Sequence, residues 1–317
     1  MLAFPQHVRM FSLAVEFGPY LCEDNYVLGL FRGLPFVGVF LGIFVSIFIS
    51  DNKTRKGTIV LFNLITNLAY LILVSSQNIY FALVGQFLAL FGSLPTLRTS
   101  MSIVADVTEP VLRQRFVSCL LAANAVGAIF GGAMYPLIGH WRLASLYIGL
   151  LPSLLLTLLL IAILKDSPRF ILRNAENAEE AAEEFNKIGR INGVGQEMMY
   201  RAEELVEIIQ REKEAMQIKN SISVLDLFRY DSLRIVSIFL SLSYTVNHIC
   251  FLSYNAVIEH VGLTPVINSA VLYTSEIVAI PVIIAVVPFF SRLFLFHVSL
   301  GCAVLFSTAA YFVTVPE

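Results

Sequence analysis

Charged side chains are scarce in this chain: Asp, Glu, Lys and Arg make up only 14% of its 317 residues, whereas 57% are hydrophobic. A soluble domain is nearer a quarter charged and half apolar, so a soluble fold would leave much apolar surface in water. The formal net charge of -2 also lacks the basic excess that nucleic-acid binding requires. We therefore expect most of the surface to face membrane lipid.

Cysteines are few, and they lie far apart at Cys22, Cys119, Cys250 and Cys302. This spacing fits neither a metal knuckle nor a disulfide framework, so we interpret them as buried free thiols. The sequence also lacks a glycine-rich phosphate loop, a catalytic pair and a metal-ligand cluster. It therefore predicts no enzymatic activity, no cofactor and no metal site.

The N-terminal stretch lacks the apolar core of a secretory signal. It carries Arg9 and no acid before Glu16. We interpret residues 1–27 as a non-membrane segment, and a mitochondrial address stays open on this basis.

Long apolar runs dominate the remainder of the chain. A spanning helix needs about 20 apolar residues to cross about 30 Å of hydrocarbon. The segments that reach or approach this length are Leu28–Ile49, Thr58–Val74, Ile79–Ile103, Phe116–Ile138, Leu143–Leu164, Ile235–Ile258, Ala270–Phe290 and Leu293–Val313. They predict an all-α membrane protein of about eight transmembrane helices, with five in a first-half bundle (28–164) and three in a second half (235–317).

Basic residues are concentrated in every second loop between the predicted spans. Residues 53–56 hold three of them, Arg113 and Arg115 follow the third span, and many more lie in 165–234. Between these, Ser75–Asn78 is uncharged and Gly139–Arg142 holds only Arg142. The positive-inside rule places the basic loops on the cytosolic side, or on the equivalent side of an organelle membrane. A mitochondrial inner membrane and a plasma membrane both fit this pattern.

The polar stretch between the fifth and sixth spans (165–234) is helical in pattern. Its apolar residues recur at helical spacing among glutamates, at Ala178, Ala181, Ala182, Phe185 and Ile188 and again at Met198, Ala202, Leu205, Val206 and Ile209. This periodicity predicts two amphipathic helices lying against the ends of the bundle.

Ridges of small residues mark predicted helix–helix contacts. Gly29–Gly33 and Gly38–Gly42 form such ridges on the first span, and Ala123, Gly127 and Gly131 form one on the fourth. In lipid, small residues let helix backbones approach closely.

Four short motifs follow one another in order. Residues 50–57 read Ser-Asp-Asn-Lys-Thr-Arg-Lys-Gly, and residues 106–113 run from Asp106 through Pro110 to Arg113. Residues 165–172 read Lys-Asp-Ser-Pro-Arg-Phe-Ile-Leu. The fourth motif comprises residues 188–193 together with the entry into the sixth span at 225–234.

These motifs resemble the major facilitator superfamily, and within it the organic cation/anion transporters. In the signature loop Asp51, Arg55 and Lys56 match, whereas Ile47, Asn52 and Thr54 replace a glycine, a basic residue and a second glycine. The spans then correspond to the second through ninth helices of that family. The resemblance implies an incomplete, truncated major facilitator fold.

The resemblance also implies a charge relay, or gate, at the basic-loop ends of the helices. Its members would be Asp51, Arg55, Lys56, Asp106, Arg113, Asp166 and Arg169. The alternative is that these are solvated loop charges, worth about 0–1 kcal/mol each.

Polar residues within the spans are the candidates for cavity or interhelical contacts: Gln86, Arg98, Asn247, His248 and Glu276. Glu276 would be a substrate-cation or proton site, or else a structural partner of Arg32, Arg98 or His248 or a contact to another subunit. The structural role is the preferred interpretation. We expect Arg98 to snorkel toward the membrane surface or to pair with Asp106. Gln86 stands where the resemblance implies an arginine in the fourth helix of the family.

Two function hypotheses follow. The preferred one is a non-transporting structural or accessory subunit of a larger membrane complex, because alternating access needs two complete halves. The alternative is an organic-ion or sugar-like solute transporter completed by a partner chain or by homo-oligomerisation. Both imply membrane lipid and other membrane subunits as partners, and the small-molecule substrate stays open. A membrane enzyme or receptor ranks well below them.

Overall fold

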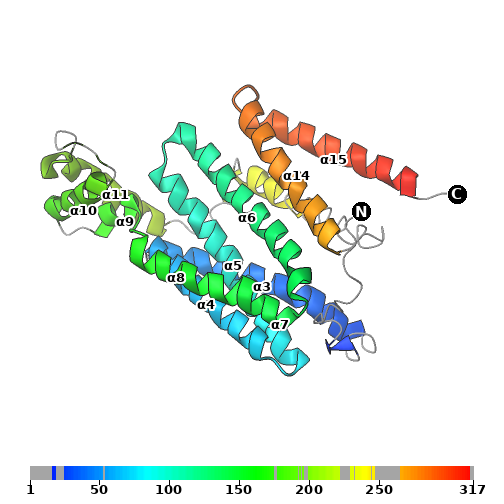
Figure 1. Cartoon of the computed structure of the whole chain (residues 1–317). Coiled ribbons are helices and arrows are strands. Elements are labelled where there is room, and N and C mark those ends of the chain that lie inside the picture. Colours follow the sequence, from blue (N-terminus) through cyan, green and yellow to red (C-terminus); the bar gives the residue numbers. More distant parts are fainter. Residues whose placement is uncertain are drawn as a thin grey trace.

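The computed structural model describes most of the chain, and every element in the described residues is a helix. The described residues are 16–18, 25–52, 54–174, 177–191, 193, 195, 199–221, 229–231, 233–243, 245–246 and 265–314. The predicted all-α membrane architecture is confirmed (Figure 1).

Five apolar helices, each long enough to cross a membrane, form the first half. They are α3 (Asn25–Asn52), α4 (Arg55–Ser75), α5 (Ile79–Val107), α6 (Pro110–Ile138), and a continuous span made of α7 (Trp141–Ala144), the π-helix η1 (Ser145–Leu150) and α8 (Leu151–Ile163). All five spans predicted for this half are present.

Local residues set the boundaries of these helices. Thr54 caps α4 through its hydroxyl, which accepts a hydrogen bond from the Gly57 amide at 2.7 Å. Asn78 caps α5 in the same way, with its side-chain oxygen 3.1 Å from the Tyr80 amide. Gly139 ends α6 with a φ of 71°, a left-handed conformation that glycine adopts without steric cost.

Helices α3, α4 and α5 pack most closely, and glycines make this packing feasible. A Cβ on Gly38 or Gly42 of α3 would lie 2.5 or 2.3 Å from the carbonyl oxygen of Phe87 or Phe91 on α5. The predicted Gly38–Gly42 ridge is therefore a helix–helix contact. A Cβ on Gly29, Gly33 or Gly127 would meet no described atom within 4 Å.

The fourth-span ridge is correspondingly open, because α6 lies apart from most of the first-half bundle. Ala123 is exposed, and a Cβ on Gly131 would meet only Ile148, at 3.8 Å. Helix α6 packs instead along α14 (Pro265–Val286) of the second half. Figure 1 shows these two helices side by side.

The polar stretch forms three helices at the basic-loop end of the bundle: α9 (Pro168–Asn174), α10 (Ala178–Ile191) and α11 (Ala202–Ser221) (Figure 1). They share a small core of Leu172, Ala181, Ala182, Leu205 and Ile209. The two predicted amphipathic helices are present. However, Val206, predicted on the apolar face, is 57% exposed, and Met198 lies outside the described residues.

The second half matches its prediction in part. Helix α14 (Pro265–Val286) begins five residues before the predicted Ala270. It ends four residues before Phe290, because a turn occupies 287–290. Helix α15 (Arg292–Thr314) agrees closely with the predicted eighth span. The predicted span Ile235–Ile258 is described only up to residue 246, apart from residue 244. In this part the structure has an apolar helix from Leu233 to Ser243.

The interpretation of the cysteines as buried is wrong for two of them. Cys119 and Cys302 are free thiols and both are exposed, since they lie on lipid-side faces of α6 and α15 that no described helix covers. Cys22 and Cys250 lie outside the described residues.

Candidate functional site

An ion pair joins α4 to α5 at the basic-loop end. Arg55, the first residue of α4, pairs with Asp106 near the end of α5. The same guanidinium donates a hydrogen bond to the backbone carbonyl of Ser102, at 2.8 Å. The two charged side chains are 22% and 9% exposed, so the contact is mostly shielded from water. Such a charge-assisted pair holds the two helix ends in a fixed register.

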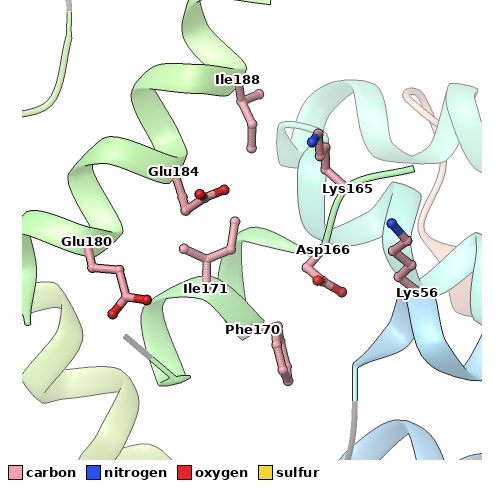
Figure 2. A pocket seen from close by; sticks show the side chains of 8 residues that line it. All are labelled: Lys56, Lys165, Asp166, Phe170, Ile171, Glu180, Glu184 and Ile188. Carbon is pink, nitrogen blue, oxygen red and sulfur yellow. The ribbon is translucent and has the colours of Figure 1, made fainter. Parts of the chain in front are cut away.

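A second polar cluster lies where α4 and α8 meet the polar helices. The Lys56 ammonium donates a hydrogen bond to the backbone carbonyl of Ile161, at 3.1 Å. Nearby, the Oδ1 atom of Asp166 is buried and has no hydrogen-bond partner among the side chains that the structure describes. Both residues line a cleft of about 370 Å³ together with Lys165 and Glu184 of α10. In Figure 2 the side chains of Lys165, Asp166 and Lys56 lie along the same side of this cleft.

The structure brings together part of the predicted charge relay. Arg55 and Asp106 are in contact, and Lys56 and Asp166 line one cleft. Arg113 lies apart: it is exposed on the first turn of α6 and makes no ion pair with a described residue. Asp51 and Arg169 are placed on α3 and α9, and their side chains lie outside the described part of the structure.

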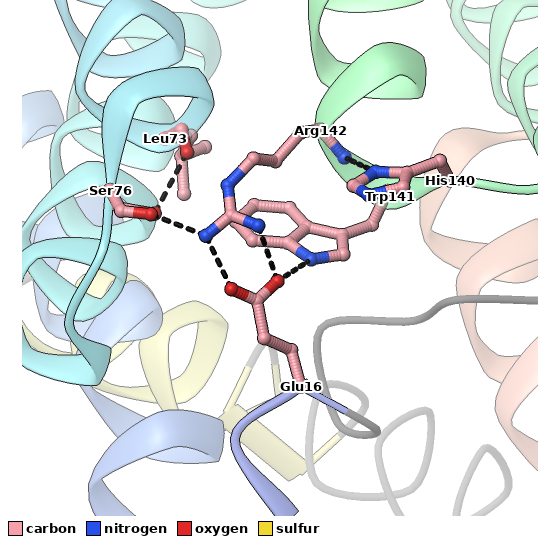
Figure 3. Close-up of polar contacts among 6 residues, drawn as sticks. All are labelled: Glu16, Leu73, Ser76, His140, Trp141 and Arg142. Atoms are coloured by element: carbon pink, nitrogen blue, oxygen red, sulfur yellow. Dashed lines mark hydrogen bonds and ion pairs between the residues drawn. The ribbon is translucent and has the colours of Figure 1, made fainter.

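A further polar cluster lies at the opposite end of the bundle and was not predicted from the sequence (Figure 3). The Arg142 guanidinium donates hydrogen bonds to both carboxylate oxygens of Glu16 and to the backbone carbonyl of Ser76, which follows α4. The Trp141 indole nitrogen donates to the same carboxylate, at 2.7 Å. These contacts tie the segment before α3 to the end of α4 and the start of the fifth span.

Electrostatics at this outer cluster favour the ionised carboxylate. Burial of Glu16 would raise its pKa, but the hydrogen bonds from Arg142 and Trp141 outweigh burial and leave the pKa below its ordinary value. The guanidinium also lies over the Trp141 ring, 4.5 Å from its centroid. Two sequence features could have indicated this cluster: Arg142 is the only charge in its loop, and Trp141 is the only tryptophan in the chain.

Polar side chains within the spans form a third group. Glu276 lies on α14, partly buried, and interacts electrostatically with Tyr273 one turn before it. No ion pair joins Glu276 to Arg98 among the described side chains. Gln86 is half-buried on α5, whereas Arg98 is exposed beside a groove that Arg55 also lines.

The remaining predicted polar residues, Asn247 and His248, lie outside the described residues, as does the side chain of Arg32. One interhelical hydrogen bond was not predicted: the Asn67 side chain on α4 donates to the Thr157 hydroxyl on α8, at 2.9 Å. Both residues are buried, so this bond belongs to the packing of the first-half bundle.

Comparison with known proteins identifies the family. The family model described as "Sugar (and other) transporter" matches residues 2–316. The organic cation/carnitine transporter 4 of Arabidopsis thaliana is 27% identical over 184 residues, which make up 57% of this chain. The same match covers 34% of that transporter, so the chain corresponds to about a third of its relative's length. The chain is therefore an integral membrane protein of the sugar (and other) transporter family, within the major facilitator superfamily, whose members are transporters and not enzymes.

Proposed function

We propose that this chain takes part in the transport of an organic cation, with Glu276 as the residue that attracts the cation. The observation that supports this most is the position of Glu276 on α14, the second-half helix that packs along α6 of the first half. In transporters the solute site lies near the membrane midplane, at the junction between the two halves. An acid within a span costs several kcal/mol unless it is paired or hydrated, and a polar solute path hydrates it.

Transport requires further helices around this junction. Helix α6 packs on α14, but much of its apolar surface stays uncovered by described helices, and side chains such as Val126 and Phe130 are more than half exposed. The open small-residue ridge at Ala123 and Gly127 is suited to close helix approach. The additional helices would come from a longer form of this chain, a second copy or a partner protein.

The chemistry of the cluster at the basic-loop end supports a working gate. Arg55 and Asp106 hold the ends of α4 and α5 together through a shielded ion pair. Asp166 has a buried oxygen without a hydrogen-bond donor in the described part of the chain, in a cleft that two lysines also line. An unsatisfied buried acceptor is costly, so a rearrangement that lets a lysine reach Asp166 would be favourable. Such a rearrangement would give the cluster the two arrangements that a gate needs.

A structural or accessory subunit is the second candidate function, and the departures from the signature loop favour it. Ile47, Asn52 and Thr54 stand where the family has a glycine, a basic residue and a glycine. Residues 289–294, where the loop should recur in the second half, contain no acid. On this hypothesis Glu276 would stabilise an assembly.

An uptake measurement distinguishes the two. The full chain with its co-purifying partners would be reconstituted in liposomes and tested with labelled tetraethylammonium, carnitine and glucose. We expect saturable uptake of the cation, reduced at least about tenfold in Glu276→Gln, which removes about 1.4 kcal/mol or more of transition-state stabilisation. Glu109→Gln, an exposed acid in the α5–α6 loop, is the matched control and should retain uptake.

The same samples also test the second candidate. If the wild-type assembly takes up none of the three solutes and Glu276→Gln changes only its size on native separation, the proposal of transport is wrong and the accessory role stands. If Glu276→Gln abolishes uptake while the assembly keeps its size, the transport proposal is supported.

A further inference from the structure

A groove opens between α4, α6 and the start of the fifth span, at the end of the bundle opposite the basic loops. It has a volume of about 350 Å³, within the range of about 300–1,000 Å³ that is typical of small-molecule sites. Tyr70 of α4, Tyr135 of α6 and Trp141 of α7 are among the residues that line it. Because Tyr135 and Trp141 stand close to helix ends, the groove lies near the outer membrane surface.

Rigid groups form the walls of this groove. A Cβ on Gly149 would lie 2.5 Å from the Tyr70 ring, so this ring packs directly on the backbone of the π-helix η1. Tyr70 and Tyr135 also pack against the apolar cluster that includes Trp141. By contrast, a Cβ on Gly131 would meet a described atom only at 3.8 Å, which leaves space beside α6. The groove is therefore preformed, and it adjoins a π-helix, a feature that is frequent at functional sites.

The groove is neutral and carries hydroxyl groups. None of the described residues that line it is charged, and the neighbouring Glu16 and Arg142 offset each other's charge. Within the described part of the chain, no hydrogen bond engages the hydroxyl of Tyr70, Tyr135 or Ser145, and none of these oxygens is fully enclosed. Since a hydroxyl can both donate and accept, these groups can bind another hydroxyl. This chemistry favours a neutral ligand with one small polar group over an ion.

The flanks of the groove face membrane lipid. Phe130 and Leu137 of α6 are 57% and 66% exposed, and Tyr147 of η1 is 55% exposed. These side chains adjoin the lining residues in the chain, and no described helix covers them. A ligand can therefore enter sideways from the bilayer. A neutral ligand that takes this route is a membrane lipid with a small polar head.

We propose that this groove binds a sterol. The sterol hydroxyl forms hydrogen bonds with the hydroxyls of Tyr70 and Tyr135, and the fused rings lie beside Gly131, where no side chain fills the space. A sterol suits the preformed walls better than a flexible acyl chain does, because a rigid ring system loses little conformational entropy on binding. The site is separate from Glu276 and does not depend on the transport proposal.

The test is the binding of labelled cholesterol to the full chain, purified in a neutral detergent without added sterol. Binding should be saturable, and unlabelled cholesterol should compete for it. Epicholesterol differs only in the orientation of its hydroxyl, which would point away from the two tyrosines. It should compete at least about tenfold more weakly, which corresponds to the loss of about one hydrogen bond.

Two double variants test the hydroxyl groups. Tyr70→Phe combined with Tyr135→Phe removes both partners of the sterol hydroxyl and should weaken cholesterol binding about tenfold or more. Tyr80→Phe combined with Tyr147→Phe removes two exposed hydroxyls at the same end of the membrane. This control should change the affinity less than about twofold.

A further variant tests the space in the groove and keeps the proposal testable if the tyrosine variants do not fold. Gly131→Leu fills the groove without removing any hydrogen bond and should abolish saturable binding. Gly301→Leu, on α15 where a Cβ would meet no described atom, should retain it. The proposal is wrong if the wild type shows no saturable binding or if the two sterol epimers compete equally. Equal losses in the two tyrosine pairs, or full binding by Gly131→Leu, would also overturn it.

Discussion

The carboxylate of Glu16 and the guanidinium of Arg142 are joined by two hydrogen bonds, both at 2.5 Å, although 126 positions separate the residues in the chain. The contact lies over an apolar cluster that includes Phe17, Leu73 and Trp141. It fastens the segment before α3 at the outer end of the bundle, opposite the Arg55–Asp106 pair. The first half is thus held by ion pairs at both ends.

Replacing Arg142 tests the strength of this outer cluster. Arg142→Leu leaves the partly buried Glu16 carboxylate without its charged donor and should lower the free energy of unfolding by about 2–3 kcal/mol. Arg113→Leu, at an exposed position without a described partner, should change it by less than about 0.5 kcal/mol. Reversible unfolding in mixed micelles measures both. Equal effects would mean that the cluster adds no stability of its own.

The lowered pKa of Glu16 makes this contribution dependent on pH. The folded-state pKa lies below the ordinary value of 4.5, so the stabilisation is fully present above about pH 4.5 and is lost as the pH falls through the folded pKa. The difference in unfolding midpoint between the wild type and Glu16→Gln should be constant from pH 7 to 5 and should shrink at lower pH. A difference that grows on acidification would contradict the assignment.

The close contact between α3 and α5 predicts a different response at two glycines of one helix. Gly42→Ala would place a Cβ 2.3 Å from the Phe91 carbonyl oxygen, and the helices must separate, at a cost of about 1–3 kcal/mol. Gly33→Ala meets no described atom within 4 Å, and its higher helix propensity should stabilise by up to about 1 kcal/mol. Thermal unfolding of the two variants checks this, and the expected signs are opposite.

The small core of the polar helices allows a similar comparison between neighbours. Leu205 is 2% exposed, whereas Val206 is 57% exposed. Leu205→Ala should destabilise α9–α11 by about 2–4 kcal/mol, and Val206→Ala by less than about 0.5 kcal/mol. Hydrogen exchange of the α10 amides reports this local opening. Faster exchange in both variants alike would show that Val206 is also covered, for example by lipid.

The sequence was sufficient to predict the features that depend on local pattern. Apolar length predicted the five spans of the first half. The signature loop and the motif at 106–113 singled out Arg55 and Asp106, which the structure brings into contact; their role in a gate stays a prediction. The Gly38–Gly42 ridge was also predicted correctly, because residues four apart lie on one helix face.

Features that depend on which segments meet in space could not be predicted. Glu16 and Arg142 lie in loops that become neighbours only after α3 to α6 have packed. The open ridge at Gly127 has the same pattern as the packed ridge at Gly42, and only the position of α6 separates them. Val206 adjoins Leu205 in the chain, and helical periodicity alone did not decide which of the two is buried.

The most direct test of the transport proposal is uptake of tetraethylammonium by the reconstituted assembly, compared between the wild type and Glu276→Gln. We expect saturable uptake that falls at least about tenfold in the variant, while the assembly keeps its size on native separation. Equal uptake in both, or no uptake by the wild type, would contradict the role proposed for Glu276.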